Sequence, residues 1–211
     1  TAGGGLGAGH YLLDPLNVEI VSGSSNTAIN GDNLLVPTGS TAQIGASGLL
    51  STLATSNVTV TTEKTGGGEA GTITIQSPLA FTGSSASTLT LLAAENIAID
   101  SSITSSNAAL NINLYAQGNV VVANNVNITT AGGYLNVAGS NDDGAVLGNK
   151  LGQAGSFSLG TTSGNGGTIS TVGLSDAAGG AVTIKTVVRD DTSLASATTG
   201  HIKLYGDITT S

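Results

Sequence analysis

The stretch that decides the fold runs from Asn57 to Gly139. It reads NVTVTT (57–62), GTITIQSPLAF (71–81), TLTLLAAENIAIDSSI (88–103), ALNINLYAQGNVVVANNVNI (109–128) and YLNVAG (134–139). Apolar and polar residues alternate within each run, and Gly, Asn, Ser or Pro separates one run from the next. This alternation is the pattern of a strand with one buried face, and its regular return is typical of a parallel β-solenoid.

The runs align into three columns of aliphatic residues. The columns are Ile73, Ile97 and Val120, spaced by 24 and 23 residues; Leu79, Ile103 and Val126, with the same spacings; and Leu89, Leu110 and Leu135, spaced by 21 and 25. Three columns with one period predict three strands in each coil of about 20–25 residues. Each strand then points its aliphatic residues inward, where they pack against the neighbouring coils.

Polar residues mark the starts of these strands. Asn96 and Asn119 stand at equivalent positions before two of them, and Asn57 stands before an earlier one. Asparagine tolerates left-handed backbone angles and forms hydrogen bonds along a stack, so we predict turn or ladder residues at these positions.

The pattern extends on both sides of this stretch. Upstream, we predict a strand at Asn17–Val21, entered through Pro15, and one helical turn at the closely spaced Leu49, Leu50 and Leu53. Downstream, a further series places Phe157, Val182 and Ile202 at intervals of 25 and 20 residues. The expectation is a single solenoid domain over residues 1–211, as a segment of a longer rod.

Two segments interrupt the repeat. Residues 63–71 are rich in glycine, and residues 140–153 are rich in glycine, asparagine and aspartate. Such residues favour turns and irregular backbone, so both segments are predicted to be loop excursions from the solenoid. They are also the loops through which we expect a ligand to be contacted.

Composition limits the class of protein. Only 9% of the 211 residues are charged and 3% are aromatic, whereas 32 are glycine. Globular domains carry about 25% charged residues, so Thr, Ser, Asn and Gly cover this surface instead. The regular Val, Ile and Leu strands favour repetitive β structure over disorder, because disordered chains lack them.

Charge and cysteine usage exclude several functions. Thirteen acidic residues against five basic ones give a net charge of −8, and no basic cluster occurs. Nucleic acids and anionic membranes need clustered cations, so neither is an expected partner. The chain has no cysteine for disulfides or thiol chemistry. No apolar run approaches the roughly 20 residues that span a bilayer, so no membrane insertion is expected.

The segment LLDPLNVEI (12–20), followed by a polar stretch and by strands such as NVTV and GTITI, resembles filamentous haemagglutinin-type exoproteins. These are large adhesins that Gram-negative bacteria export by two-partner secretion. The resemblance is sharp over about nine residues and general over the rest. It implies a right-handed parallel β-helix, secreted or attached to the bacterial outer surface, and an outer-membrane transporter as partner during export.

The resemblance implies a non-enzymatic adhesin segment that displays a binding surface toward host cells, matrix receptors or exopolysaccharide. One alternative is a structural subunit that associates end to end into a filament or surface layer. Another is a polysaccharide lyase or hydrolase, since several β-helical proteins have such activity. No cofactor, catalytic residue or metal ligand is assigned.

Several polar residues are candidates for catalysis, but they can equally be ordinary surface residues. Asp142-Asp143, Asp190-Asp191 with Arg189, and His201 with Lys203 could supply an acid, a base and a cation. However, the two acidic pairs are about two coils apart, and Asp is a common turn residue. We therefore expect solvated turn carboxylates.

Candidate metal ligands and candidate sugar-binding tyrosines also have ordinary structural alternatives. Two adjacent carboxylates supply only part of the six to eight oxygens that Ca²⁺ needs. His10 and His201 have no companion at ligand spacing. Tyr115, Tyr134 and Tyr205 could stack on sugar rings where they are exposed, although packing at a coil corner is the alternative.

Overall fold

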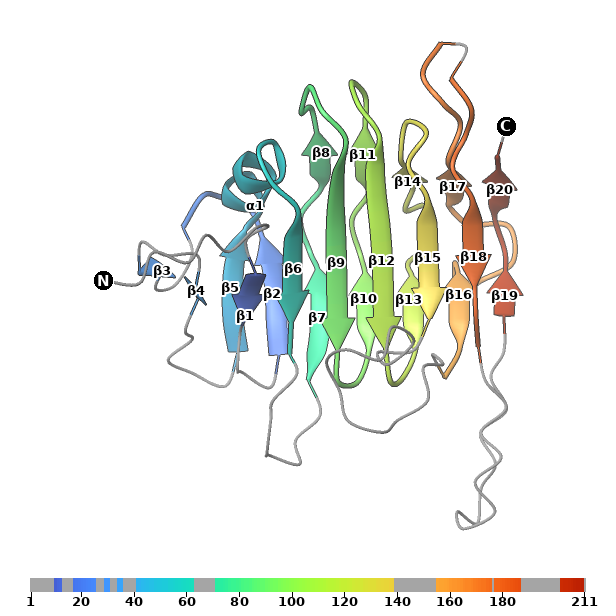
Figure 1. Ribbon diagram of the computed structural model, residues 1–211. Coiled ribbons are helices and arrows are strands. Elements are labelled where there is room, and N and C mark those ends of the chain that lie inside the picture. Colours follow the sequence, from blue (N-terminus) through green and yellow to red (C-terminus); the bar gives the residue numbers. More distant parts are fainter. Residues whose placement is uncertain are drawn as a thin grey trace, which may run out of the picture.

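The computed structural model describes residues 10–12, 17–25, 29–30, 34–35, 41–62, 71–138, 155–175, 177–186 and 202–210. Most of its regular structure is β-strand, arranged in three parallel sheets with one short helix, α1 (Ala46–Leu53) (Figure 1). The prediction of an all-β protein built from parallel strands is therefore confirmed.

We call the three parallel sheets I, II and III. Sheet I contains β1 (His10–Leu12), β6 (Val58–Thr61), β9 (Ser87–Ala93), β12 (Leu110–Ala116), β15 (Leu135–Ala138) and β18 (Val182–Ile184). Sheet II contains β5 (Thr41–Gly45), β2 (Asn17–Val21), β7 (Thr72–Ile75), β10 (Ile97–Ile99), β13 (Val120–Val122), β16 (Phe157–Leu159) and β19 (Ile202–Leu204). Sheet III contains β8 (Leu79–Phe81), β11 (Ile103–Ser105), β14 (Ile128–Thr129), β17 (Thr168–Ser170) and β20 (Asp207–Thr209). A short antiparallel pair, β3 (Ile29–Asn30) and β4 (Leu34–Leu35), forms a separate sheet, and β4 contacts β1 of sheet I.

From β7 onward the strands visit sheets II, III and I in turn. Thus β7, β8 and β9 are followed by β10, β11 and β12, and each strand pairs in parallel with its equivalent in the next repeat. The arrangement fits three strands per coil, as the three columns predicted.

The register corrects two of the three predicted columns. Ile73, Ile97 and Val120 are cross-strand partners, as predicted. In sheet III, however, Ile103 pairs with Ile128 and not with Val126. In sheet I, the partner of Leu89 and Leu135 is Ile112 and not Leu110. Both errors are slips of two residues, which leave the side chain on the same face of a strand.

The predicted downstream series Phe157, Val182 and Ile202 combines residues of two different sheets. Phe157 and Ile202 are partners in sheet II, but Val182 lies in sheet I and pairs with Leu135. The repeat also lengthens here. Asn119 and Ser156, which are hydrogen-bonded neighbours, are 37 residues apart, whereas Asn96 and Asn119 are 23 apart. The period of about 20–25 residues therefore holds only for the middle repeats.

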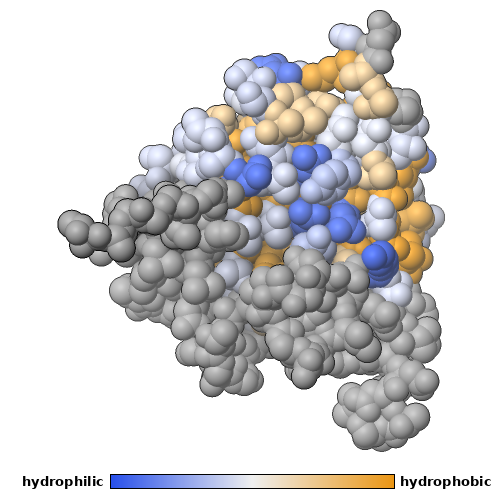
Figure 2. Space-filling model, in the orientation of Figure 1, coloured by the Kyte–Doolittle hydropathy of each residue, from blue (hydrophilic) through white to orange (hydrophobic). Residues whose placement is uncertain are grey.

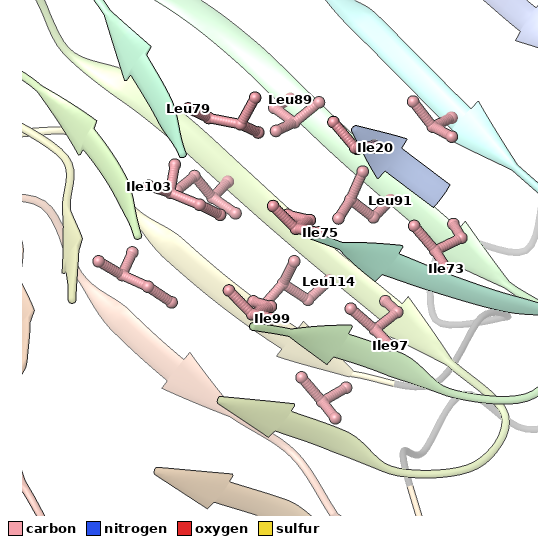
Figure 3. Packing of buried hydrophobic residues seen from close by; sticks show 14 of the residues in the cluster. Ile20, Ile73, Ile75, Leu79, Leu89, Leu91, Ile97, Ile99, Ile103 and Leu114 are labelled. Atoms are coloured by element: carbon pink, nitrogen blue, oxygen red, sulfur yellow. The ribbon is translucent and has the colours of Figure 1, made fainter. Parts of the chain in front are cut away.

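The core lies between the three sheets. Inward residues of successive strands form rows of Ile, Leu and Val, and Ile97 and Val120 are fully buried, as predicted. Figure 3 shows these side chains converging from different sheets, with Ile97 and Ile99 from sheet II, Ile103 from sheet III and Leu114 from sheet I. Because each repeat has only a few inward residues, its apolar surface is buried mainly by the repeats on either side.

The asparagines that precede strands form the predicted ladders. The N–H of Asn119 donates to Oδ1 of Asn96 at 2.8 Å, and the hydroxyl of Ser156 donates to Oδ1 of Asn119 at 2.7 Å. Equivalent bonds to an Asn Oδ1 join Thr72 to Asn17 in sheet II, Thr88 to Asn57 in sheet I, and Thr168 to Asn127 in sheet III. A side-chain carbonyl thus binds a backbone N–H of the next repeat, which adds one bond to the strand ladder.

The β1–β5 end of the molecule departs from the repeat. The strand predicted at Asn17–Val21 is present as β2, but it lies between β5 and β7, out of chain order. The predicted helical turn is α1, which contacts β8 and so lies beside the outermost strand of sheet III. Figure 1 shows β3 and β4 beyond β5 on the same end.

Two serines attach α1 to the sheets. The N–H and the hydroxyl of Ser47 donate to the carbonyl of Gly23 at 3.1 and 2.7 Å. At the other end of the helix, the hydroxyl of Ser87 donates to the carbonyl of Leu53 at 2.7 Å. Leu49 and Leu53 point into the core, whereas Ser47 and Ser51 are exposed. α1 is therefore amphipathic, and its apolar side covers the core at this end of the molecule.

Candidate binding face on sheet I

Sheet I has the longest described strands and therefore the widest outer face. β9 and β12 have seven residues each, whereas the strands of sheet III have two or three. Every second residue of β9 and β12 points inward and is buried, so the alternate residues point outward. The outward residues are those that a ligand could reach.

The central outward row is polar across five strands. Thr59, Thr90, Asn113, Asn136 and Thr183 are cross-strand neighbours in this order. Neighbouring strands are about 4.8 Å apart, so the row repeats a hydroxyl or an amide at that interval. We call these five residues the central row.

A hydrogen-bond network fixes the amides of this row. The amide Nδ2 of Asn136 donates to the Tyr115 hydroxyl at 3.0 Å, and that hydroxyl donates to Oδ1 of Asn113 at 3.2 Å. Nδ2 of Asn113 then donates to the hydroxyl oxygen of Thr90 at 3.2 Å. The network crosses β15, β12 and β9, and it sets the orientation of both amides. Among the described residues, none donates a hydrogen bond to Oδ1 of Asn136, so this oxygen remains available to accept one from a ligand.

A second polar row runs beside the central row. It consists of Asn57, Thr88, Asn111 and Tyr134. Oδ1 of Asn111 accepts the N–H of Tyr134 at 3.2 Å, so this row belongs to the asparagine ladder described above. The ring of Tyr134 is 38% exposed. On the opposite side of the central row, Thr61, Leu92 and Ala138 are buried and Tyr115 is half-buried.

Figure 2 shows this face of the molecule, with hydrophilic residues gathered in its middle. None of the residues in the central row or the second row is charged. Amides and hydroxyls both donate and accept hydrogen bonds, and an aromatic ring adds a flat apolar surface. This combination suits a neutral ligand that carries many hydroxyl groups, such as a polysaccharide.

The three tyrosines proposed for sugar contact do not lie together. Tyr115 and Tyr134 belong to sheet I, where Tyr115 is tied into the amide network. Tyr205 lies between β19 and β20, at the junction of sheets II and III, and is 39% exposed. Of these three tyrosines, only Tyr134 therefore presents an exposed ring on the candidate face.

The residues weighed for catalysis are mostly not described. Asp142, Asp143, Arg189, Asp190, Asp191 and His201 lie outside the described residues, as do the loop segments 63–70 and 140–153. Lys203 is exposed on β19. Within the described ranges, no three His, Cys, Asp or Glu side chains form a group that could hold a metal ion.

Two of the described carboxylates bind side chains of sheet II. Oε2 of Glu19, on β2, accepts a hydrogen bond from Nε2 of Gln43 on β5 at 3.1 Å. Oε2 of Glu95, in the bend before β10, accepts a hydrogen bond from the hydroxyl of Thr72 on β7 at 3.4 Å. The outward positions between them and Lys203 include Ala98 and Val121, so sheet II has no continuous polar row.

Sequence reasoning did not single out Asn113 and Asn136. The signal was nevertheless present, because Asn alternates with aliphatic residues in LNINL (110–114) and LNV (135–137). An amide at an outward position of two successive strands predicts a lateral amide row.

No family model matches this chain, and no curated protein or solved structure matches it either. In the described part of the chain, no helix is long and apolar enough to cross a membrane.

Proposed function

We propose that this chain is a non-enzymatic display module that binds a neutral polysaccharide on the outer face of sheet I. The observation that carries the proposal is the central row, in which hydroxyls and fixed amides continue across five strands without a charge. An extended polymer laid along the row would meet a similar polar group on each strand. Many weak contacts would then add up to useful affinity.

The fold that supports this role is a closed, right-handed parallel β-helix with three strands per coil. Its support is the recurring order of sheets II, III and I together with the common core between them. Right-handed crossovers are the rule for parallel strands, which favours this hand. In such a rod the outer face of sheet I lies along the side, away from both ends.

The biological setting in this proposal is adhesion at a bacterial surface. The support is the resemblance of LLDPLNVEI (12–20), and of the repeats that follow it, to filamentous haemagglutinin-type exoproteins. In this setting the polysaccharide belongs to a host cell, the extracellular matrix or a biofilm. The chain would reach the surface through an outer-membrane transporter.

The test is binding of the purified chain to an array of neutral and acidic polysaccharides, followed by affinity electrophoresis with the glycans that score. We expect binding to neutral chains, and a loss of at least tenfold in affinity for the double variant Asn113→Ala with Asn136→Ala. Both residues are half-buried and outward, so the variant should keep its fold, which circular dichroism will check.

The matched control is the double variant Thr129→Ala with Ser170→Ala, two outward neighbours on sheet III. It should bind as the wild type does. If no polysaccharide binds, or if both double variants bind equally well, sheet I is not the binding face. Binding that is lost only on deletion of residues 63–70 or 140–153 would assign the contact to those loops.

A further inference from the structure

The accessible part of the outer face of sheet I is a narrow strip. The central row and the second row are two residues apart along each strand, which is roughly 7 Å. At the next outward positions on one side, Leu92 and Ala138 are buried and Tyr115 is half-buried. On the other side, β9 and β12 begin at Ser87 and Leu110, directly before the second row. A strip of two rows suits a single polysaccharide chain and not the surface of a crystalline fibre.

The central row is regular along the sheet. Its five residues follow one another from β6 to β18 as direct cross-strand partners, without a slip in register. Each step along the row is about 4.8 Å. In a β-(1→4)-linked chain of pyranoses, which is a straight ribbon, every sugar advances the chain by nearly this length, so one sugar can lie on each strand. An α-(1→4)-linked chain curves into a helix and would leave the row after a few sugars.

The neutral groups of the row suit a ribbon whose sugars alternate in orientation. Successive sugars of a β-(1→4)-linked chain present opposite edges to a fixed side. Hydroxyls and amides both donate and accept hydrogen bonds, so they can bind either edge. On β15 Asn136 offers its Oδ1 as an acceptor, and Thr183, the next residue of the row, is exposed.

Tyr134 adds an apolar surface beside this row. Its ring is 38% exposed, and its neighbour on β18 is Ala181, whose methyl group leaves space on that side. The ring can therefore stack on a sugar that lies at Asn136 or Thr183. Stacking needs C–H groups on the face of the sugar. β-Linked glucose has them on both faces because all its ring substituents are equatorial, so either face of an alternating chain fits.

We propose that the ligand of sheet I is an unbranched β-(1→4)-linked glucan, bound as a single chain along the rod with one sugar on each of β6, β9, β12, β15 and β18. Tyr134 holds one of these sugars by stacking. This inference rests on the proposed function, because it names the ligand class of the same face. Helical α-glucans should be poor ligands.

The test is isothermal titration calorimetry with two series of glucose oligosaccharides of two to five sugars. The cello-oligosaccharides are β-(1→4)-linked, and the malto-oligosaccharides contain the same sugar in α-(1→4) linkage. We expect the affinity for the cello series to rise about threefold with each added sugar, because each sugar reaches one more strand. The malto chain of five sugars should bind at least tenfold more weakly than its cello counterpart.

Variants of two tyrosines test the stacking contact. Tyr134→Ala should weaken binding of the cello chain of five sugars about tenfold, whereas Tyr134→Phe, which keeps the ring, should stay within about twofold of the wild type. The matched control is Tyr205→Ala. It removes a ring of similar exposure, 39%, between β19 and β20, and it should bind as the wild type does.

The outcomes separate this inference from the proposed function. Equal affinity for the two series, no gain beyond two sugars, or equal binding by Tyr134→Ala and Tyr205→Ala would overturn the inference. If other neutral polysaccharides bind on the array and the cello series does not, the inference fails alone and the binding face stands. If no polysaccharide binds, the proposed function fails with it.

Discussion

The two ends of the rod use the same strand pattern and yet differ in burial. Ile44 on β5 and Leu204 on β19 belong to the same row of sheet II, but Ile44 is 2% exposed and Leu204 is 48% exposed. Alternation of apolar residues places a side chain on the inner face, but only an adjacent layer removes it from water. The comparison shows that repeat pattern and burial are separate properties in this fold.

The closed end has elements that the repeat does not contain. α1 covers the core with Leu49 and Leu53 and presents Ser47 and Ser51 to solvent, and hydrogen bonds from Ser47 and Ser87 attach it to the strands. At the other end of the described structure, β19 and β20 instead continue the regular register. Closing a solenoid thus needs a segment that leaves the pattern.

The largest test of this comparison places the same charge at two positions of one row. Ile97→Asp should cost about 4 kcal/mol or more of the free energy of unfolding, because a carboxylate would enter the core without a partner. Ile202→Asp, which lies in the same row, should cost less than about 0.5 kcal/mol because water reaches it. Urea denaturation at low protein concentration measures both. Equal losses would mean that Ile202 is as well buried as Ile97.

A smaller effect is expected from truncating one leucine at each end. Leu53, the last residue of α1, is fully buried, so Leu53→Ala should cost about 3 kcal/mol of the free energy of unfolding. Leu204 is 48% exposed, so Leu204→Ala should cost less than about 0.5 kcal/mol. Thermal melting followed by circular dichroism can compare them. A larger loss for Leu204→Ala would mean that Leu204 is the better buried of the two leucines.

The smallest effect concerns the asparagine ladder between the two ends. Asn96→Ala removes the acceptor for the N–H of Asn119 and should cost about 1 kcal/mol of the free energy of unfolding. Ser85→Ala, on an exposed bend between β8 and β9, serves as the control and should be neutral. Indistinguishable melting of the two variants would show that the ladder bonds add nothing to the strand pairing.

Much of the middle of the fold could be predicted from the sequence. Ile73, Ile97 and Val120 were aligned correctly because the repeats that separate them have nearly equal length, 24 and 23 residues. The slips to Val126 and Leu110 arose because a shift of two residues keeps the same face, so alternation alone cannot detect them. The spacing of Leu49, Leu50 and Leu53 correctly indicated α1.

Other features could not be predicted from periodicity. The insertion of β2 between β5 and β7 joins Asn17 to Thr72, and a repeat pattern indicates only neighbours about one period apart. The polar face of sheet I was missed because its residues are individually ordinary. Only the register, which brings Asn113 beside Asn136, reveals that they form one row.

The position of β2 has a consequence for the order in which the chain folds. The bond between Thr72 and Asn17 spans 55 residues, whereas the bond between Asn119 and Asn96 spans 23. Closing the longer loop costs more entropy, so we expect the repeats around β9 and β12 to form first. β2, although it precedes these repeats in the sequence, would then be among the last strands to enter its sheet. A chain that emerges from its N-terminus could not complete its first layers until β7 had followed.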